Sequence, residues 1–170
     1  MKLLISATLA ASMVYPTVAG TAERIDDGVS SLKQLYCLSE AVYFESGNQP
    51  FVGKLAVAEV IINRVKNVKY PNSICKVVHQ GPTRESWKKN GTYYPVRHRC
   101  QFSYYCDGKT DKPLVETSTW KKSYNAASFA FYNNVDIVDG ATHYHATYVS
   151  PSWSKQLRRV TRIEDHIFYK

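Results

Sequence analysis

The sequence lacks the features that divide a chain into several domains or hold it in a membrane. No Gly/Ser-rich linker, internal repeat or low-complexity tract interrupts the 170 residues, and no apolar run after the first twenty is long enough to span a bilayer. It also has no C-x-x-C pair and no His-Glu-x-x-His motif. We therefore expect one domain with its own core, no stable membrane insertion, no metal and no cofactor.

The first twenty residues, MKLLISATLAASMVYPTVAG, have the order of a secretory signal peptide. A lysine precedes the apolar residues 3–15, and small residues end the segment at Ala19 and Gly20. The alternative, a transmembrane anchor, needs about 20 apolar residues, which is more than this run supplies. We expect cleavage near Ala19 or Gly20, which leaves residues 21–170 as a single exported domain.

The four cysteines, Cys37, Cys75, Cys100 and Cys106, all follow that segment. An even number of cysteines in an exported chain predicts two disulfides, for which three pairings exist. We favour Cys100–Cys106, which closes a short loop, together with Cys37–Cys75. A zinc site is the rival interpretation, and the missing C-x-x-C pair disfavours it.

The chain is basic, with a formal charge of +8 from 22 Lys and Arg against 14 Asp and Glu. Such a charge attracts an exported protein to an anionic polymer or surface. Outside the cytoplasm, cell-wall glycan with its peptide carboxylates is a better candidate than nucleic acid. The alternative is that the charge only aids solubility. We expect a monomer that binds peptidoglycan strands and no nucleic acid.

The apolar periodicity predicts a mainly helical protein with a small antiparallel sheet, the α+β class. Ser31 is the expected cap of a first helix, whose apolar face ends in Glu45, and Gly47 and Asn48 supply the stop signal. Residues 81–99 read as a long loop and residues 100–108 as an extended piece or hairpin. The other expected elements are helices over residues 50–67, 73–80 and 118–134, the last capped by Thr117, and strands within 141–149 and 160–169.

Glu45 is the strongest candidate for a catalytic residue, because it follows Tyr43 and Phe44 at the end of the first helix. Neighbouring rings remove water from the carboxyl group and the helix terminus adds negative charge, and both raise its pKa. A glutamic acid that stays protonated near neutral pH can donate a proton to a glycosidic oxygen. The alternative is a surface glutamate at a frayed helix end.

Several motifs in this order resemble the SleB/CwlJ-type cell-wall hydrolases. They are CLSEAVYFESGNQPFVGKLAVAEVIINRV, YPNSICKVVHQ, CQFSYYCDG, GATHYHATYVSPSW and RIEDHIFY, and the resemblance runs from Leu35 to Tyr169. It implies a lysozyme-like fold and action on the glycan strands of peptidoglycan. The family's catalytic glutamate lies in a motif usually written Y-x-E-A-R-G-E-P, and its position here is Glu45.

Two places depart from the family pattern, of which the first bears on mechanism and the second on a turn. Gln49 replaces the second glutamate of the motif, and Glu164-Asp165 stands before His166 where the family often has a glycine. A mechanism that uses both glutamates of the motif is therefore in doubt here. Asp107 is the best distant candidate for a second acid, although an Asp-Gly pair is more often only a turn.

With no partner acid near Glu45 in the sequence, we favour a lytic transglycosylase over a hydrolytic N-acetylmuramidase, which normally needs two carboxyl groups. The expected target is the β-1,4 bond between N-acetylmuramic acid and N-acetylglucosamine. Further candidates for substrate contact are Tyr43, Gln101, Phe102, Ser103, Tyr144 and His145, with Trp153 and other aromatic residues able to stack on sugars. Weaker alternatives are a zinc amidase using His143 and His145, a non-catalytic glycan-binding module and a basic secreted nuclease.

Overall fold

The computed structural model describes residues 20–170, and the environments of side chains from residue 30 onward. The expected signal peptide lies outside the described residues apart from Gly20, so it stays a prediction. None of the described helices combines the length and apolar character that crossing a membrane requires. The elements are α1 Gly20–Ser46, α2 Phe51–Lys66, α3 Ile74–Val78, β1 Thr83–Glu85, β2 Tyr93–Pro95, η1 Ser103–Cys106, α4 Ser118–Asn133, β3 His143–Ala146, η2 Ser152–Gln156, β4 Arg159–Ile163 and β5 His166–Tyr169.

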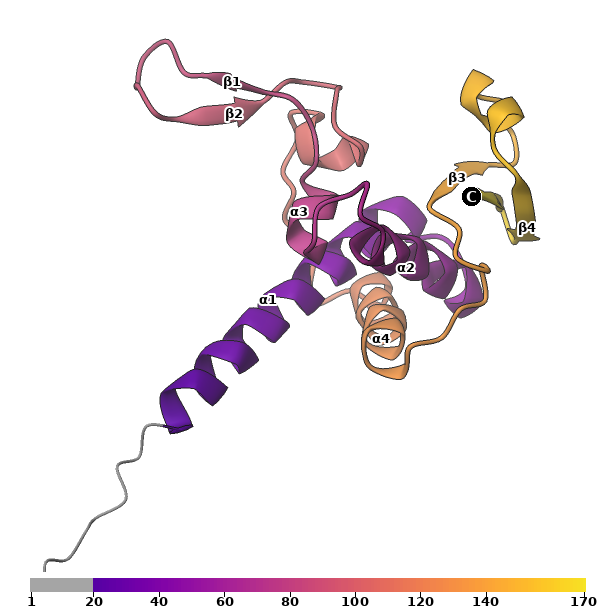
Figure 1. Cartoon of the computed structure of the whole chain (residues 1–170), viewed down its shortest axis with the longest axis horizontal. Coiled ribbons are helices and arrows are strands. Elements are labelled where there is room, and N and C mark those ends of the chain that lie inside the picture. The colour runs from indigo at the N-terminus through magenta and orange to yellow at the C-terminus, as the bar shows by residue number, and fades with distance from the viewer. Residues whose placement is uncertain (1–19) are drawn as a thin grey trace, which may run out of the picture.

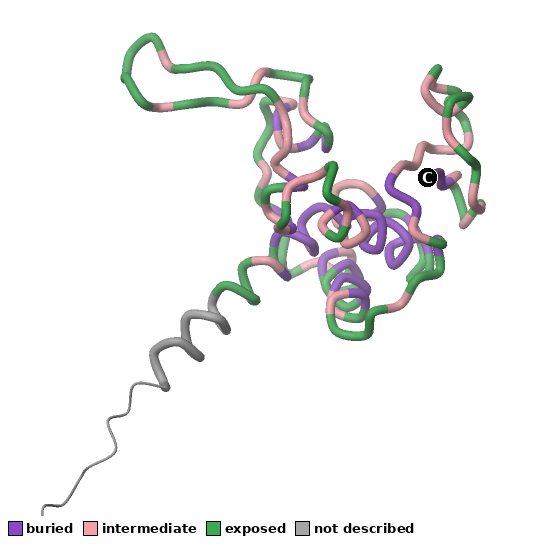
Figure 2. The backbone as a smooth tube through the Cα atoms, in the orientation of Figure 1, coloured by how far each residue is buried: buried purple, intermediate pink, exposed green. Residues whose placement is uncertain are grey.

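Helix α2 lies at the centre of the molecule, between the other helices and the small sheet (Figures 1 and 2). One side of α2, with Leu55 and Ile61, packs into an apolar cluster shared with α1, α3, α4 and the η1 region. Its other side, with Ala56 and Val60, packs into a second cluster with Phe168 of the sheet. Since α2 is buried on both sides, it fixes the position of the sheet relative to α1.

The end of α1 is set by close packing rather than by left-handed backbone. The expected start at Ser31 is wrong, because the helix already begins at Gly20, whereas its end at Ser46 agrees with the stop signal. Neither Gly47 nor Asn48 has a positive φ. A Cβ atom on Gly47 would lie 2.6 Å from the carbonyl oxygen of Tyr43, so only glycine allows the chain to turn this tightly.

Helix α4 follows its sequence signals closely. Its N-cap is Thr117, whose hydroxyl accepts a hydrogen bond from the backbone N–H of Trp120 at 3.2 Å. Trp120 and Ala127 are buried on its inner side. Local capping and periodicity were therefore sufficient to predict this element.

The expectations for residues 81–108 are wrong in two places. Strands β1 and β2 form an antiparallel hairpin where a loop was expected, and this hairpin projects from the body at the upper left of Figure 1. Residues 103–106 form the 3₁₀ helix η1 rather than an extended piece. The hairpin strands are exposed, so they lack the alternating burial that makes a strand visible in sequence.

The second sheet contains strands in both expected ranges, but residues 160–169, expected as one strand, belong to two strands joined by a turn. Strand β5 lies between β3 and β4, and both pairs are antiparallel. Glu164 turns the chain between β4 and β5 with a φ of 49°, a left-handed conformation that glycine adopts more easily. The family's glycine near this position therefore has a structural reason, and this chain retains the turn without it.

Both favoured disulfides are present. Cys37 joins α1 to Cys75 in α3, with Cα atoms 5.3 Å apart, and Cys100 joins Cys106 with Cα atoms 6.1 Å apart. The first bond ties two helices of the core together, and the second closes the loop that carries Gln101 and Phe102.

Candidate active site

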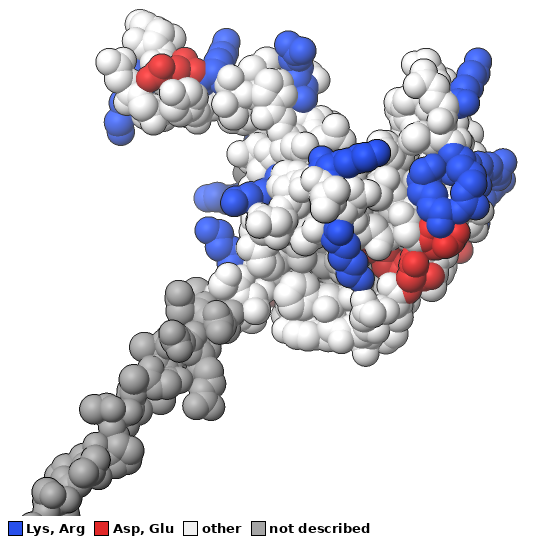
Figure 3. All heavy atoms as spheres, in the orientation of Figure 1, with Lys and Arg blue, Asp and Glu red and all other residues white. Residues whose placement is uncertain are grey.

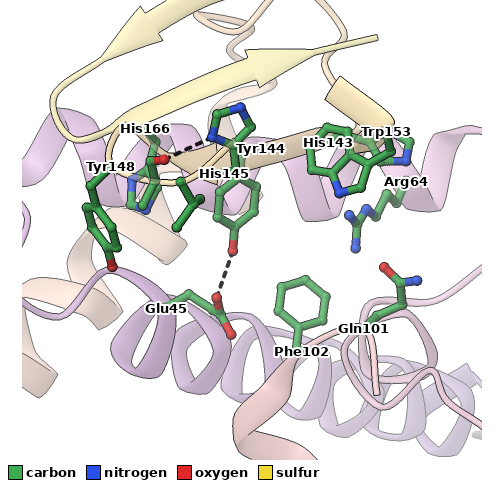
Figure 4. Close-up of a pocket in the computed structure, with 12 residues that line it drawn as sticks. Glu45, Arg64, Gln101, Phe102, His143, Tyr144, His145, Tyr148, Trp153 and His166 are labelled. Carbon is green, nitrogen blue, oxygen red and sulfur yellow. Dashed lines mark hydrogen bonds between the residues drawn. The ribbon is translucent and has the colours of Figure 1, made fainter. Parts of the chain in front are cut away.

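A cavity of about 620 Å³ opens between the end of α1, α2, the loop held by the Cys100–Cys106 disulfide, and strand β3 (Figure 4). Its lining combines one carboxylate, one guanidinium, three imidazoles and several aromatic rings. The lining residues are Glu45, Arg64, Gln101, Phe102, His143, Tyr144, His145, Ala146, Tyr148, Val149, Trp153 and His166. Such a mixture of ring faces and hydrogen-bonding groups suits a polar ligand with apolar ring faces, such as a sugar.

Glu45 is the single carboxylate in this lining and receives a hydrogen bond from the far side of the cavity. The Tyr144 hydroxyl of β3 donates to Glu45 Oε2 at 3.0 Å, across 99 positions of sequence; Figure 4 shows the tyrosine directed at the carboxyl group. Burial raises the pKa of Glu45, while the Tyr144 hydrogen bond and the Arg64 cation oppose that rise. Burial also raises the pKa of Tyr144 well above its ordinary value, so the hydroxyl stays a donor.

We expect the variant Tyr144→Phe to shift the alkaline limb of the rate–pH profile to higher pH. The hydrogen bond stabilises the ionised carboxylate, so its loss raises the pKa of Glu45 further. A general acid must be protonated, and activity falls as pH rises through its pKa. The measurement is kcat/KM for glycan cleavage between pH 4 and 9.

Tyr148→Phe is the matched control for this experiment, because Tyr148 lines the same cavity but is highly exposed. Its profile should coincide with that of the unsubstituted protein. An unchanged alkaline limb in Tyr144→Phe would contradict the prediction from the sequence that Glu45 is the titrating acid.

Lys54 of α2 holds the backbone that follows Glu45. Its side chain is 1% exposed, and Nζ donates to the carbonyl oxygens of Ser46, Gly47 and Gln49 at 2.7, 2.8 and 2.6 Å. These carbonyls belong to the end of α1 and the following turn, so the ammonium offsets the negative end of the helix dipole. Of the two causes that the sequence suggested for a raised Glu45 pKa, burial is therefore the one that acts here.

Arg64 of α2 supplies a buried cation to the cavity. It is 5% exposed, its Nε donates to the Thr142 carbonyl at 2.7 Å, and its guanidinium carbon lies 5.4 Å from the ring centres of both Tyr70 and Phe102. Its buried Nη1 has no hydrogen-bond partner among the described residues. A desolvated donor that lines a cavity is suited to bind an acceptor oxygen of a ligand.

Lys54 and Arg64 were both missed by reasoning from the sequence. Each lies inside the mainly apolar stretch that forms α2, and a cation between buried apolar residues was the signal that could have identified them.

The histidines of β3 face Trp153 on one side of the strand. The ring centres of His143 and His145 lie 5.5 and 5.6 Å from the Trp153 ring. His145 uses both nitrogens, Nδ1 with the Ala146 carbonyl and Nε2 with the Tyr169 hydroxyl, each at 2.9 Å. Burial lowers the pKa of His143. Among the residues that the structure describes, no three His, Cys, Asp or Glu side chains are grouped as metal ligands.

The structure brings together most of the residues that the sequence selected. Glu45, Gln101, Phe102, Tyr144 and His145 line the cavity, as do Trp153 and His143. The other two candidates for substrate contact lie elsewhere.

Tyr43 is outside the cavity, since it packs against Phe44 and Trp120 with ring centres 5.0 and 6.0 Å apart. Ser103 is exposed at the start of η1 and is likewise outside the lining. Asp107 Oδ1 accepts a hydrogen bond from the Lys109 backbone at 2.7 Å. It is therefore a turn residue, and it does not line the cavity with Glu45.

The two departures from the family pattern contact each other. The buried Gln49 side chain donates from Nε2 to Asp165 Oδ2 at 2.9 Å, and its Oε1 accepts from the Asp165 backbone N–H at 3.4 Å. This pair joins the α1–α2 turn to the β4–β5 turn. Gln49 does not line the cavity, so the missing glutamate at this position removes no carboxylate from it.

The arrangement of a helical core, a small antiparallel sheet and an acid at the end of α1 defines a lysozyme-like α+β protein. The fold is shared with the crystal structure of the catalytic domain of Bacillus cereus SleB, at a TM-score of 0.57 and 25% identity over 81% of this chain and 89% of that one. It is also shared with the catalytic domain of the germination-specific lytic transglycosylase SleB of Bacillus anthracis, at a TM-score of 0.55 and 26% identity over 81% and 93% of the two chains.

The chain belongs to the cell wall hydrolase family, whose model matches residues 48–169. The match begins three residues after Glu45, so the matched region does not include that residue. This places the chain in the family that the sequence motifs indicated.

Curated relatives are spore cortex-lytic enzymes. The enzyme of Halalkalibacterium halodurans is 27% identical over 132 residues, which cover 77% of this chain and 33% of the relative. That of Bacillus cereus is 38% identical over 50 residues, which cover 29% and 19% of the two chains. The matched region thus spans a third or less of these longer relatives.

Proposed function

We propose that this protein is an exported peptidoglycan-degrading enzyme that acts as a lytic transglycosylase with Glu45 as its one catalytic acid. Its target is the β-1,4 bond between N-acetylmuramic acid and N-acetylglucosamine. The observation that carries the proposal is that half-buried Glu45 is the single carboxylate in the described cavity lining, with its pKa raised by desolvation. The SleB-type fold supports the same class of substrate.

The reaction needs one group that first gives and then takes a proton. Protonated Glu45 donates its proton to the glycosidic oxygen, which leaves as the 4-hydroxyl of N-acetylglucosamine when its bond to C1 breaks. The resulting carboxylate then accepts the proton of the C6 hydroxyl of N-acetylmuramic acid as that oxygen bonds to C1. The product is a 1,6-anhydro sugar, and no water is consumed.

Other side chains of the cavity bind the substrate or control the orientation and ionisation of Glu45. Tyr144 orients the Glu45 carboxyl group and stabilises its ionised form. The free Nη1 of Arg64 binds an acceptor oxygen of the substrate, and Trp153 offers a ring face to a sugar. Phe102, which is almost fully buried, forms an apolar part of the wall.

Hydrolysis by a retaining or inverting route fits this cavity less well. Both routes use a second carboxyl group, about 5 Å away or up to roughly 9.5 Å away. Among the described residues that line the cavity, Glu45 has no carboxylate partner. A zinc amidase lacks a set of ligands in the described part of the chain.

Export is part of the proposal. The N-terminal segment has the order of a signal peptide, and the two disulfides suit an oxidising compartment. The basic charge favours an anionic wall polymer.

Mass spectrometry of digested peptidoglycan tests the reaction type. We expect products with 1,6-anhydro ends, which are lighter than hydrolytic products by one water. Reducing ends alone would show a muramidase instead, release of free stem peptides would show an amidase, and binding without soluble fragments would show a glycan-binding module.

A further inference from the structure

The hairpin of β1 and β2, with the turn between its strands, is an ordered arm that stands away from the body (Figure 1). The Ser86 N–H donates to the Thr92 carbonyl at 2.7 Å, and the Val96 N–H donates to the Pro82 carbonyl at 2.9 Å. Glu85 Oε1 accepts from the Gly91 N–H at 2.6 Å, where Gly91 has a φ of 73°. These bonds give the arm a defined shape without burial in the core.

The arm exposes large aromatic side chains that contribute little to the core. Trp87 is 88% exposed, Tyr93 61% and Tyr94 53%. Arg84 lies opposite Tyr94 in the strand register, and both line a recess of about 380 Å³ together with Glu85, Ser86 and Trp87. Grouped exposed rings beside a recess mark a binding surface, since water disfavours their exposure.

The charge of the arm favours an anionic partner. Residues 83–95 contain three basic residues, Arg84, Lys88 and Lys89, and one acid, Glu85. That acid already accepts the Gly91 N–H, whereas Lys88 lies over the Trp87 ring with Nζ 4.7 Å from its centre. Figure 3 shows basic side chains spaced along this part of the molecule, at the upper left. A ligand with apolar ring faces and carboxylates complements both properties.

The base of the arm adjoins the catalytic cavity. A Cβ atom on Gly81 would lie 3.0 Å from Cys100, so the segments that lead into and out of the arm come close together at that cysteine. The next residue, Gln101, lines the cavity, and its N–H donates to the Gln80 carbonyl at 2.9 Å. A long ligand leaving the cavity beside Gln101 therefore meets the arm next.

We propose that the arm is an accessory binding site for the peptidoglycan strand, beyond the cavity that holds the cleaved bond. Trp87 and Tyr94 stack on amino-sugar rings, and Arg84 and Lys88 bind carboxylates of the stem peptides. The inference rests on the proposed function for the identity of the polymer. It assigns the arm to capture of the insoluble wall, a role separate from the chemistry at Glu45.

The test compares the unsubstituted protein with the double variant Trp87→Ala/Tyr94→Ala in two assays. In the first, protein is sedimented at low temperature with purified sacculi stripped of attached phosphate polymers. In the second, kcat/KM is measured on a soluble tetrasaccharide fragment too short to reach the arm. We expect the apparent Kd for sacculi to rise about tenfold and the tetrasaccharide kcat/KM to change less than twofold, since each lost stacking contact weakens binding severalfold.

Tyr132→Ala is the matched control, because Tyr132 is a similarly exposed ring on α4 outside the arm. It should bind sacculi as the unsubstituted protein does. Unchanged binding by the double variant overturns the proposal, as does an equal loss in both assays, which would show that the arm only shapes the cavity. Failure of the unsubstituted protein to bind stripped sacculi also overturns it, since the partner is then a phosphate polymer.

The sedimentation assay measures binding to sacculi independently of cleavage. If the tetrasaccharide is not cleaved by any variant but sacculus binding still falls with the arm substitutions, the arm proposal stands and the proposed reaction fails.

Discussion

The variant Glu45→Gln is expected to lower the rate of glycan cleavage about a thousandfold, because the amide cannot transfer the proton that the leaving oxygen needs. The substitution keeps the size of the side chain and its ability to accept the Tyr144 hydrogen bond. The fold should therefore survive, as circular dichroism and thermal unfolding would show. The rate is measured as release of soluble fragments from purified peptidoglycan.

Glu40→Gln is the matched control, since Glu40 is a buried acid on the same helix that does not line the cavity. Burial and the neighbouring Asp111 carboxylate raise the pKa of Glu40 to about 7. The amide replaces a carboxyl group that is already partly neutral, so activity should remain within about threefold of that of the unsubstituted protein. Full activity in Glu45→Gln, or an equal loss in both variants, would refute the assignment of Glu45.

The variant Gln49→Glu is expected to destabilise the fold by about 2 kcal/mol at neutral pH. It removes the amide donor that bonds Asp165 Oδ2 at 2.9 Å and places a second carboxylate against the first. For a domain of this size the unfolding temperature should fall by roughly 4–8 °C. Thermal unfolding measures the change, and cleavage measured well below that temperature should be unaffected.

Asp165→Asn should rescue Gln49→Glu, because an asparagine amide can donate to the new carboxylate. The four proteins form a double-mutant cycle, in which we expect a coupling free energy of about 1–2 kcal/mol. Gln156→Glu adds the same charge at an exposed site and should change stability by less than about 0.5 kcal/mol. Additive effects would contradict the pairing, and a gain of activity in Gln49→Glu would point to a second acid after all.

This pairing also explains why the chain departs from the family pattern at both places. At position 49 the family's glutamate would face Asp165 with like charge, whereas the glutamine bonds it through both its amide nitrogen and its oxygen. The two substitutions are therefore compatible with each other.

The sequence by itself determined the features that depend on near neighbours in the chain. Apolar spacing located α2 and α4, the Thr117 hydroxyl marked the start of α4, and the family motifs singled out Glu45. The β1–β2 hairpin is exposed and gave no such pattern, which is why it was expected as a loop. The 3₁₀ helix η1 is partly buried but has only four residues, too few for a helical period to be recognised in the sequence.

Only the tertiary structure decided how Glu45 is surrounded. Tyr144 reaches it across 99 positions, Arg64 brings a buried cation to the same cavity, and Lys54 neutralises the helix end beside it. A hydrogen bond or a desolvated charge has its effect over a few ångströms of space, whatever the separation in sequence. Helix periodicity does not specify which side chains from distant segments come within a few ångströms of each other. Packing of the whole core decides which segments meet.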